Sequence, residues 1–253
     1  RKVLSSILEN AQMTNLTDEP KPVAEIWRPD LVSLPRLTFA RRIFRILLQG
    51  VARVVVRVVT RPTFTGLENV PRQGPALLVF NHLGDADAPV LLAALPAPMD
   101  AIGKIELHND GWVGVVGRAY GVIWVHRGSP DRRALRSALE GLQAGRMIAL
   151  APEGRESLTG ALEEGTEGAA FLAVKSGALI VPIALTGTEN ISIFERKWFQ
   201  RAPVTVTVGK PFRIQEQAAR AEMIRAGTRQ IMEEIARLLP KEYRGKYDYI
   251  SSG

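Results

Sequence analysis

From residue 75 onward, short apolar segments alternate with segments whose apolar residues recur at helical spacing. The strand-like runs occupy residues 76–80, 121–126, 147–151, 179–185 and 203–208. The helical patterns lie near residues 86–95, 107–118, 130–144, 163–176 and 215–239. Alternation of these two periods is typical of strands connected by helices. It predicts an α/β fold in which a mostly parallel central sheet is flanked by helices.

The segment before these elements predicts a basic amphipathic helix within residues 36–62. Its basic and polar positions recur at steps of three and four residues: Arg42, Arg45, Gln49, Arg53 and Arg57. The positions on the opposite side are apolar: Phe44, Leu47, Leu48, Val51, Val54, Val55 and Val58. One interpretation is a helix on an anionic membrane surface, with arginines toward the headgroups and valines toward the acyl chains. The other is a helix packed on the domain with its arginines in solvent.

Composition and charge narrow the possible functions. The 253 residues are 46% apolar, which is enough for one large domain, and we place it at residues 63–253 after a linker or truncated segment at 1–35. The absence of cysteine excludes disulfides, thiol catalysis and thiolate metal sites. The net charge of +7 is concentrated at the start of the chain, where residues 1–61 hold 11 Lys and Arg against 5 Asp and Glu. This basic stretch has little aromatic interleaving, so we expect no nucleic acid partner.

The most informative local pattern follows the strand-like run at 76–80. His82 stands there beside two carboxylates, Asp85 and Asp87. An imidazole oriented by a carboxylate is a general base, because the carboxylate fixes the tautomer and stabilises the imidazolium. Asp85 lies three positions from His82 and Asp87 five, so helical spacing favours Asp85, whereas a turn before the helix favours Asp87. The spacing leaves both partners open, and the alternative is a loop histidine with local hydrogen bonds.

Two further polar groups follow strand-like runs. Arg127 follows 121–126, and Lys104, near the start of the preceding helical region, could join it in binding a phosphate or carboxylate. Glu153, Gly154 and Arg155 follow 147–151, where Glu153 could bond substrate hydroxyls or clamp Arg127. Ligands gather beyond the carboxyl ends of parallel strands, so we expect all three groups to share one edge of the sheet. A Gly-x-Ser-x-Gly motif for a covalent serine mechanism is absent.

Taken in order, the three blocks resemble the glycerolipid acyltransferases typified by bacterial 1-acylglycerol-3-phosphate acyltransferase. The family's Asn-His-x4-Asp motif matches Asn81, His82 and Asp87. Its Gly-x-(I/V)-x-(I/V)-x-Arg motif matches residues 121–127, and its Pro-Glu-Gly motif matches residues 152–154. The resemblance covers about residues 65–212 and selects Asp87 as the partner of His82.

The resemblance implies an enzyme that transfers an acyl group from acyl-CoA or acyl carrier protein to the sn-2 hydroxyl of 1-acylglycerol-3-phosphate. His82 would be the general base and Asp87 its orienting carboxylate. The acceptor would be positioned by Lys104, Arg127, Glu153, Gly154 and Arg155. The acyl thioester would be a co-substrate, with no metal and no other cofactor. A lipid acceptor also implies work at an anionic membrane surface, as a peripheral or monotopic protein on the cytoplasmic face of the cell membrane.

The chain departs from the family at two positions. The family usually continues Glu-Gly-Thr-Arg-Ser after the proline, whereas this chain has Arg155 and then Glu156, and position 126, often acidic in the family, is His126. The acceptor could accordingly be another lysophospholipid, a lyso-ornithine lipid or a glycolipid. From other classes, His82, Asp85 and Asp87 could belong to a metal-dependent hydrolase, or the basic helix could make the chain a non-catalytic membrane-binding module.

Overall fold

The computed structural model describes residues 27–128, 131–189, 201–215 and 219–250. Its strands form one sheet in the order β1-β7-β6-β2-β5-β3-β4, in which all neighbours are parallel except β6 and β7. The strands are β1 (Thr60–Thr65), β2 (Ala76–Phe80), β3 (Asp100–Lys104), β4 (Ile123–Val125), β5 (Met147–Leu150), β6 (Leu179–Thr186) and β7 (Ala202–Val208). The predicted α/β class with a mostly parallel sheet is therefore confirmed.

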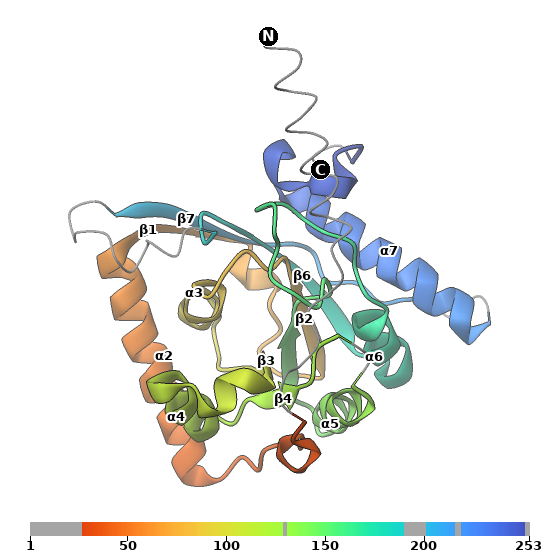
Figure 1. The fold of residues 1–253 in the computed structure, drawn as a ribbon. Helices are drawn as coiled ribbons and strands as arrows, with labels where there is room; N and C mark the ends of the chain where they lie inside the picture. Colours follow the sequence, from red (N-terminus) through yellow and green to blue (C-terminus); the bar gives the residue numbers. More distant parts are fainter. Residues whose placement is uncertain (1–26, 129–130, 190–200, 216–218, 251–253) are drawn as a thin grey trace.

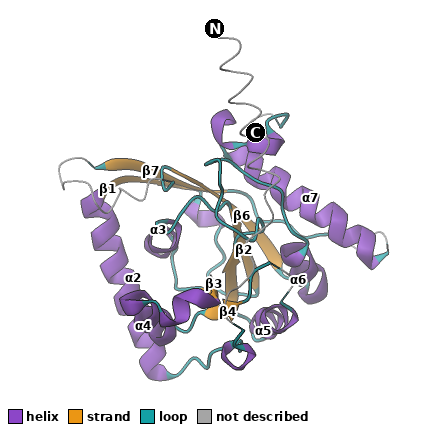
Figure 2. Cartoon of the chain, viewed as in Figure 1, coloured by secondary structure: helices purple, strands orange, loops and turns teal. Residues whose placement is uncertain are grey.

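Helices cover both faces of the sheet (Figure 1). They are α2 (Phe39–Val59), α3 (Asp87–Ala94), α4 (Gly111–Tyr120), α5 (Arg132–Gln143), α6 (Gly168–Ser176) and α7 (Arg220–Leu238). Short 3-10 turns lie at Pro29–Leu31, Leu67–Asn69, Ile105–Asn109, Lys241–Tyr243 and Gly245–Tyr247. Figure 2 shows α2, α3 and α4 on one side of the strands and α5, α6 and α7 on the other.

The central strand β2 shows why this arrangement forms. Its first four residues are fully buried, and alternate side chains enter opposite hydrophobic layers. Ala76 and Leu78 pack with α2 and α3, while Leu77 and Val79 pack with α5, α6 and α7. A strand buried on both faces needs a continuous apolar run, which is the pattern that its sequence shows.

Two strands were missing from the sequence interpretation. β1 contains Pro62 and two exposed threonines, and its position at the edge of the sheet tolerates the proline, which lacks an N–H group. β3 is short and contains Gly103. Because β1 begins at Thr60, the boundary drawn at residue 62 cuts through a strand. Lys104 is both the last residue of β3 and the residue before the 3-10 turn Ile105–Asn109 that leads to α4, so the expected place near the start of a helical region is confirmed.

Three helix boundaries also differ. The helix expected over 163–176 begins only at Gly168. The residues before it form a loop that bonds with the Pro-Glu-Gly motif at residues 152–154. The helix expected over 107–118 begins at Gly111, after the 3-10 turn. The final helix begins at Arg220. No helix in the described ranges is both long and apolar enough to cross a bilayer.

The helix expected within residues 36–62 is present as α2, but its polar stripe faces the protein. Gln49 donates hydrogen bonds to the carbonyl oxygens of Leu92 and Leu95 at 3.0 and 2.9 Å, and Arg53 donates to Ala93 and Leu95 at 3.2 and 2.9 Å. These carbonyls end α3, where unpaired oxygens and the negative end of the helix dipole favour donors and cations. The expectation that Arg45 and Arg53 face headgroups or solvent is wrong.

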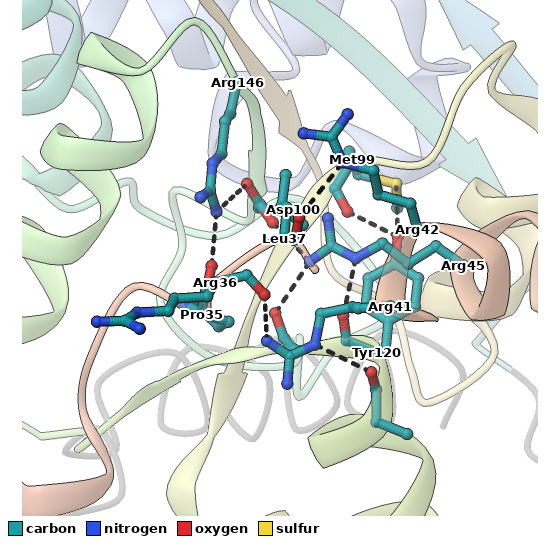
Figure 3. Close-up of polar contacts among 12 residues, drawn as sticks. Pro35, Arg36, Leu37, Arg41, Arg42, Arg45, Met99, Asp100, Tyr120 and Arg146 are labelled. Carbon is teal, nitrogen blue, oxygen red and sulfur yellow. Dashed lines mark hydrogen bonds and ion pairs between the residues drawn. The ribbon is translucent and has the colours of Figure 1, made fainter. Parts of the chain in front are cut away.

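Arg45 forms the centre of a buried polar cluster between α2, α4 and the sheet (Figure 3). Its guanidinium donates to Asp100 at 2.6 Å and to the Tyr120 carbonyl oxygen at 2.7 Å, and it lies 4.5 Å from the centre of the Tyr120 ring. Arg146 approaches the second oxygen of Asp100 at 3.5 Å. The cluster fixes α2 on the domain by charge and hydrogen bonding.

Because the polar stripe faces inward, the outer face of α2 is apolar. We call this surface, together with two residues of α4, the apolar face. Its exposed side chains are Phe39, Ile43, Ile46, Leu47, Val51, Val54, Val55 and Val58 of α2 and Trp112 and Val115 of α4. Exposed apolar side chains in this number are typical of an interaction site.

Candidate active site

The loop after β2 is anchored to the next strand before it reaches the histidine. Asn81 is buried, and its side chain pairs with the backbone of Leu185 in β6, donating to the carbonyl oxygen at 3.0 Å and accepting from the N–H at 2.7 Å. The side-chain amide therefore continues the strand pairing where the backbone leaves the sheet. The backbone just before His82 is therefore fixed at the edge of the sheet where the parallel strands end.

His82 and Asp87 form a hydrogen-bonded pair, with 2.7 Å between Nδ1 and Oδ2. The same carboxylate oxygen accepts the backbone N–H groups of Leu83 and Gly84 at 2.7 and 3.1 Å. Asp87 is buried as the first residue of α3, where the helix N-terminus favours an anion. Asp85 is exposed, so the structure answers the open choice in favour of Asp87.

This pair leaves the second ring nitrogen of His82 available. An ionised Asp87 accepts the Nδ1 proton, so the neutral imidazole presents the lone pair of Nε2. Within the described residues Nε2 has no hydrogen-bond partner, and about a third of the side chain is exposed. Burial lowers the pKa of His82, but the hydrogen bond and charge of Asp87 outweigh it and leave the pKa raised. The geometry is that of a general base facing solvent.

The third sequence block holds the backbone of His82. A turn from Ala151 to Gly154, with Gly154 at φ +72°, places the Glu153 carboxyl in the interior. That carboxyl accepts the backbone N–H of His82 at 2.8 Å and of Glu163 at 2.7 Å. Burial raises its pKa to about 8, although these hydrogen bonds act in the opposite direction. Glu153 therefore positions His82, contrary to the expectation that it bonds substrate or clamps Arg127.

Arg155 is also part of this internal support. It is buried, and its Nε donates to Glu163 at 2.6 Å, while Glu163 accepts the N–H of Leu158 at 2.9 Å with its other oxygen. The N–H of Ser157 donates to the carbonyl oxygen of His82 at 2.8 Å. The buried pairing of Arg155 is at odds with the direct substrate contact that the sequence suggested.

Lys104 and Arg127 lie at the carboxyl ends of β3 and β4, on the same edge of the sheet as His82. Lys104 is close enough to Glu156 to favour its ionised form. Arg127 lies beyond the last strand in the order, and no contact among the described residues joins it to His82. Its Nε is buried without a partner in the described chain, so this cation has a free donor for an anion.

Glu156 is the site residue that the sequence reasoning did not select. Its carboxylate lies against the loop at Gly84 and interacts electrostatically with His82, Asp85 and Lys104. Burial raises the pKa of Glu156, and nearby Asp85 adds to the increase. Within the described residues it has no hydrogen bond or ion pair. The signal in the sequence was the departure from the family pattern at this position.

Fold and site define an α/β protein with a histidine–carboxylate pair at the carboxyl edge of a mostly parallel sheet. Residues 61–186 match the model of the Acyltransferase family, and the chain belongs to that family through this domain. This match confirms the resemblance seen in the three motifs.

Named relatives agree with this assignment. A 1-acyl-sn-glycerol-3-phosphate acyltransferase of Borreliella burgdorferi is 29% identical over 51% of this chain and 52% of its own length. The chloroplastic LPAT1 of Arabidopsis thaliana is 33% identical over 50% of this chain and 36% of its own. A lyso-ornithine lipid O-acyltransferase of Pseudomonas aeruginosa is 32% identical over 46% and 44%. The chain thus spans about half or less of the length of these relatives.

A solved structure shares the fold over a larger part. The 1-acyl-sn-glycerophosphate acyltransferase PlsC of Thermotoga maritima superposes with a TM-score of 0.61, covering 78% of this chain and 81% of its own, at 22% identity. At this identity the likeness supports the fold of the domain.

Proposed function

We propose that this chain is an O-acyltransferase that moves an acyl group from a thioester to the sn-2 hydroxyl of 1-acylglycerol-3-phosphate, giving phosphatidate. The observation that carries the proposal is the His82–Asp87 pair, with Nδ1 held at 2.7 Å and Nε2 open to solvent. Family membership and the names of the relatives support the reaction class.

The proposed reaction needs one base and two oriented substrates. Nε2 of His82 removes the acceptor hydroxyl proton as the oxygen attacks the thioester carbonyl carbon, and Asp87 stabilises the imidazolium. The tetrahedral intermediate then collapses with cleavage of the carbon–sulfur bond. The imidazolium returns the proton to the leaving thiolate, so the enzyme ends unchanged. The thioester, acyl-CoA or acyl carrier protein, is a co-substrate, and the reaction as proposed uses no metal.

Lys104 and Arg127 are the cations that we propose for the acceptor phosphate. Both follow strand ends at the edge that carries His82, and the unpartnered Nε of Arg127 is a donor that an anion would satisfy. Glu153 and Arg155 support the site from inside, and the Gly154 turn shapes its wall. From the sequence we expected all five residues to position the acceptor. We now propose this role for Lys104 and Arg127 alone.

We further propose that the apolar face seats the domain on a membrane. A lipid acceptor and product favour a site that opens at the bilayer surface, and exposed Arg42 and Arg57 flank the face where anionic headgroups would lie. Since Arg45 and Arg53 serve the interior, insertion of apolar side chains supplies more of the binding than the sequence pattern suggested.

A second candidate acceptor is a lysolipid whose headgroup carries an ammonium group. Glu156 is a partly buried carboxylate without a partner in the described chain, and it stands near His82 where the family usually has arginine. A cationic headgroup would supply the missing partner, whereas a phosphate monoester would be repelled. The Pseudomonas relative, named for a lyso-ornithine lipid, supports this alternative.

Product identification by mass spectrometry tests these proposals together. Purified protein is given acyl-CoA or acyl carrier protein thioesters with 1-acylglycerol-3-phosphate, its dephosphorylated form or a lyso-ornithine lipid. Phosphatidate as the main product supports the first acceptor, and acylated ornithine lipid supports the second. Hydrolysis alone, abolished by chelation, would contradict acyl transfer in favour of a metal-dependent hydrolase. No turnover with any acceptor would leave the membrane-binding module as the better account.

A further inference from the structure

A second histidine–aspartate pair lies at the end of β4, next to Arg127. Nδ1 of His126 lies 2.8 Å from Oδ2 of Asp131, and the same oxygen accepts the backbone N–H of His126 at 3.0 Å. Oδ1 of Asp131 accepts the N–H groups of Arg133 and Ala134 at 2.9 and 3.1 Å, which caps α5. One carboxylate therefore joins the end of the strand to the start of the next helix.

The opposite side of the imidazole fixes its tautomer. The backbone N–H of Arg28 donates to Nε2 of His126 at 3.0 Å, so Nε2 carries no proton and Nδ1 carries the proton that Asp131 accepts. The Trp27 ring lies 4.5 Å from the His126 ring, and Arg133 donates to the carbonyl oxygen of Pro29. His126 is buried between these groups. Its arrangement excludes proton exchange with a substrate and indicates a role in holding the chain.

What it holds is the turn that carries Arg127. Within the described residues the Arg127 side chain makes no hydrogen bond or ion pair, so no polar contact fixes its direction. Its direction then depends on the backbone, which is fixed just before Arg127 by the two hydrogen bonds between His126 and Asp131. Burial disfavours the charge on Asp131, but the hydrogen bonds from His126 and the start of α5 leave its pKa lowered.

We propose that His126 is a positioning residue that sets Arg127 for the anionic headgroup of the acceptor through its hydrogen bonds with Asp131. The inference rests on the proposed function, in which Arg127 contacts that headgroup. Position 126 is one of the two at which this chain departs from its family, and the positioning role explains the histidine there.

Steady-state kinetics of single and double variants test this role in the full chain. His126→Phe removes both ring hydrogen bonds, and we expect the KM for 1-acylglycerol-3-phosphate to rise about tenfold with kcat changed less than twofold, because Arg127 binds and does not react. His126→Asn keeps a donor for Asp131 and should restore most of the lost affinity. Adding His126→Phe to Arg127→Gln should raise KM no further than Arg127→Gln alone.

The outcomes distinguish a failure of the positioning role of His126 from a failure of the proposed function. If Arg127→Gln raises KM but His126→Phe is without effect or adds fully to it, the positioning role is wrong and the proposed function stands. If Arg127→Gln leaves KM unchanged, the phosphate assignment fails and the role of His126 falls with it. Long-range proton–nitrogen NMR gives a readout without activity, because the chain has only three histidines. His126 must appear as the Nδ1–H tautomer, and a proton on Nε2 would overturn the proposal.

Discussion

The carboxyl group of Glu153 and the backbone N–H of His82 are joined by a 2.8 Å hydrogen bond, so the turn after β5 holds the loop after β2. With the bond from Ser157 to the carbonyl oxygen of the same histidine, both backbone groups of His82 are fixed by one neighbouring segment. The imidazole is then oriented by Asp87, and only its Nε2 side remains open. This arrangement makes the Pro-Glu-Gly motif a support for His82.

The Glu153 support is tested by Glu153→Gln. The glutamine amide nitrogen cannot accept the second backbone N–H, so we expect activity to fall about tenfold and unfolding free energy by about 1–3 kcal/mol, the cost of a buried unpaired group. In the wild type, the folded pKa near 8 exceeds the ordinary value of 4.5, so its stability relative to the variant is greatest below pH 4.5 and declines toward pH 8. Urea unfolding of both proteins across this pH range measures the difference in stability. A difference that does not change with pH would contradict the raised pKa of Glu153.

The Asp87 pairing predicts a shift in the pH–rate profile. A general base must be unprotonated, and Asp87 raises the pKa of His82, so activity in the wild type falls on acidification at a higher pH than an ordinary imidazole allows. Asp87→Asn removes the charge and should move this acidic limb to lower pH while reducing the maximal rate about a hundredfold. An unmoved limb in kcat/KM would show that another group titrates.

The buried cluster around Arg45 predicts unequal costs for two arginines on one helix. Among the described residues, Arg45→Met leaves Asp100 with only the longer contact to Arg146, and breaking such a buried pair costs about 3 kcal/mol or more. Arg42→Met is the matched control, because Arg42 is exposed and should cost less than about 0.5 kcal/mol. Chemical denaturation compares them, and equal losses would contradict the inward orientation of the stripe.

The apolar face predicts membrane binding driven mainly by apolar side chains. Leu47→Glu should reduce partitioning onto anionic vesicles at least tenfold, since burying one leucine contributes about 1.5–3 kcal/mol. Trp112→Ala should weaken binding too, whereas Tyr249→Ala, an exposed aromatic elsewhere, should not. Binding is measured by sedimentation with vesicles, using variants shown to be folded. Undiminished binding of the Leu47 variant would reject this face as the membrane contact. Deletion of α2 is a poorer test, because its stripe caps α3 and α4.

The sequence predicted those parts of the molecule whose signal is local. The buried run at β2 and the motif at residues 81–87 could be interpreted because an apolar period and a short spacing express them directly. β1 and β3 could not, since an edge strand with Pro62 and a short strand with Gly103 take their stability from pairing partners distant in sequence. The roles of Glu153 and Arg155 could not be predicted either, because the sequence does not show whether a charged side chain is buried or faces a substrate.

The amphipathic pattern of α2 illustrates the same limit for orientation. Periodicity separates a polar from an apolar side but does not say which side meets the protein. Here the carbonyl ends of α3 and α4 supply partners for Arg45, Gln49 and Arg53, so the polar side turns inward. Those partners lie about 40 to 75 residues away in sequence, beyond the reach of a local pattern.

The most direct test of the central claim is the rate of acyl transfer by His82→Ala, measured beside the wild type and beside His108→Ala. In the described chain His108 makes no hydrogen bond with His82 or Asp87; its Nδ1 bonds with the adjacent Asn109, and its ring packs edge-on against Trp124. General-base catalysis contributes about 10²–10⁴-fold, so His82→Ala should lose at least a hundredfold in kcat while unfolding at the same urea concentration as the control. Turnover by a folded His82→Ala within tenfold of the wild type would contradict the assignment of His82 as the base.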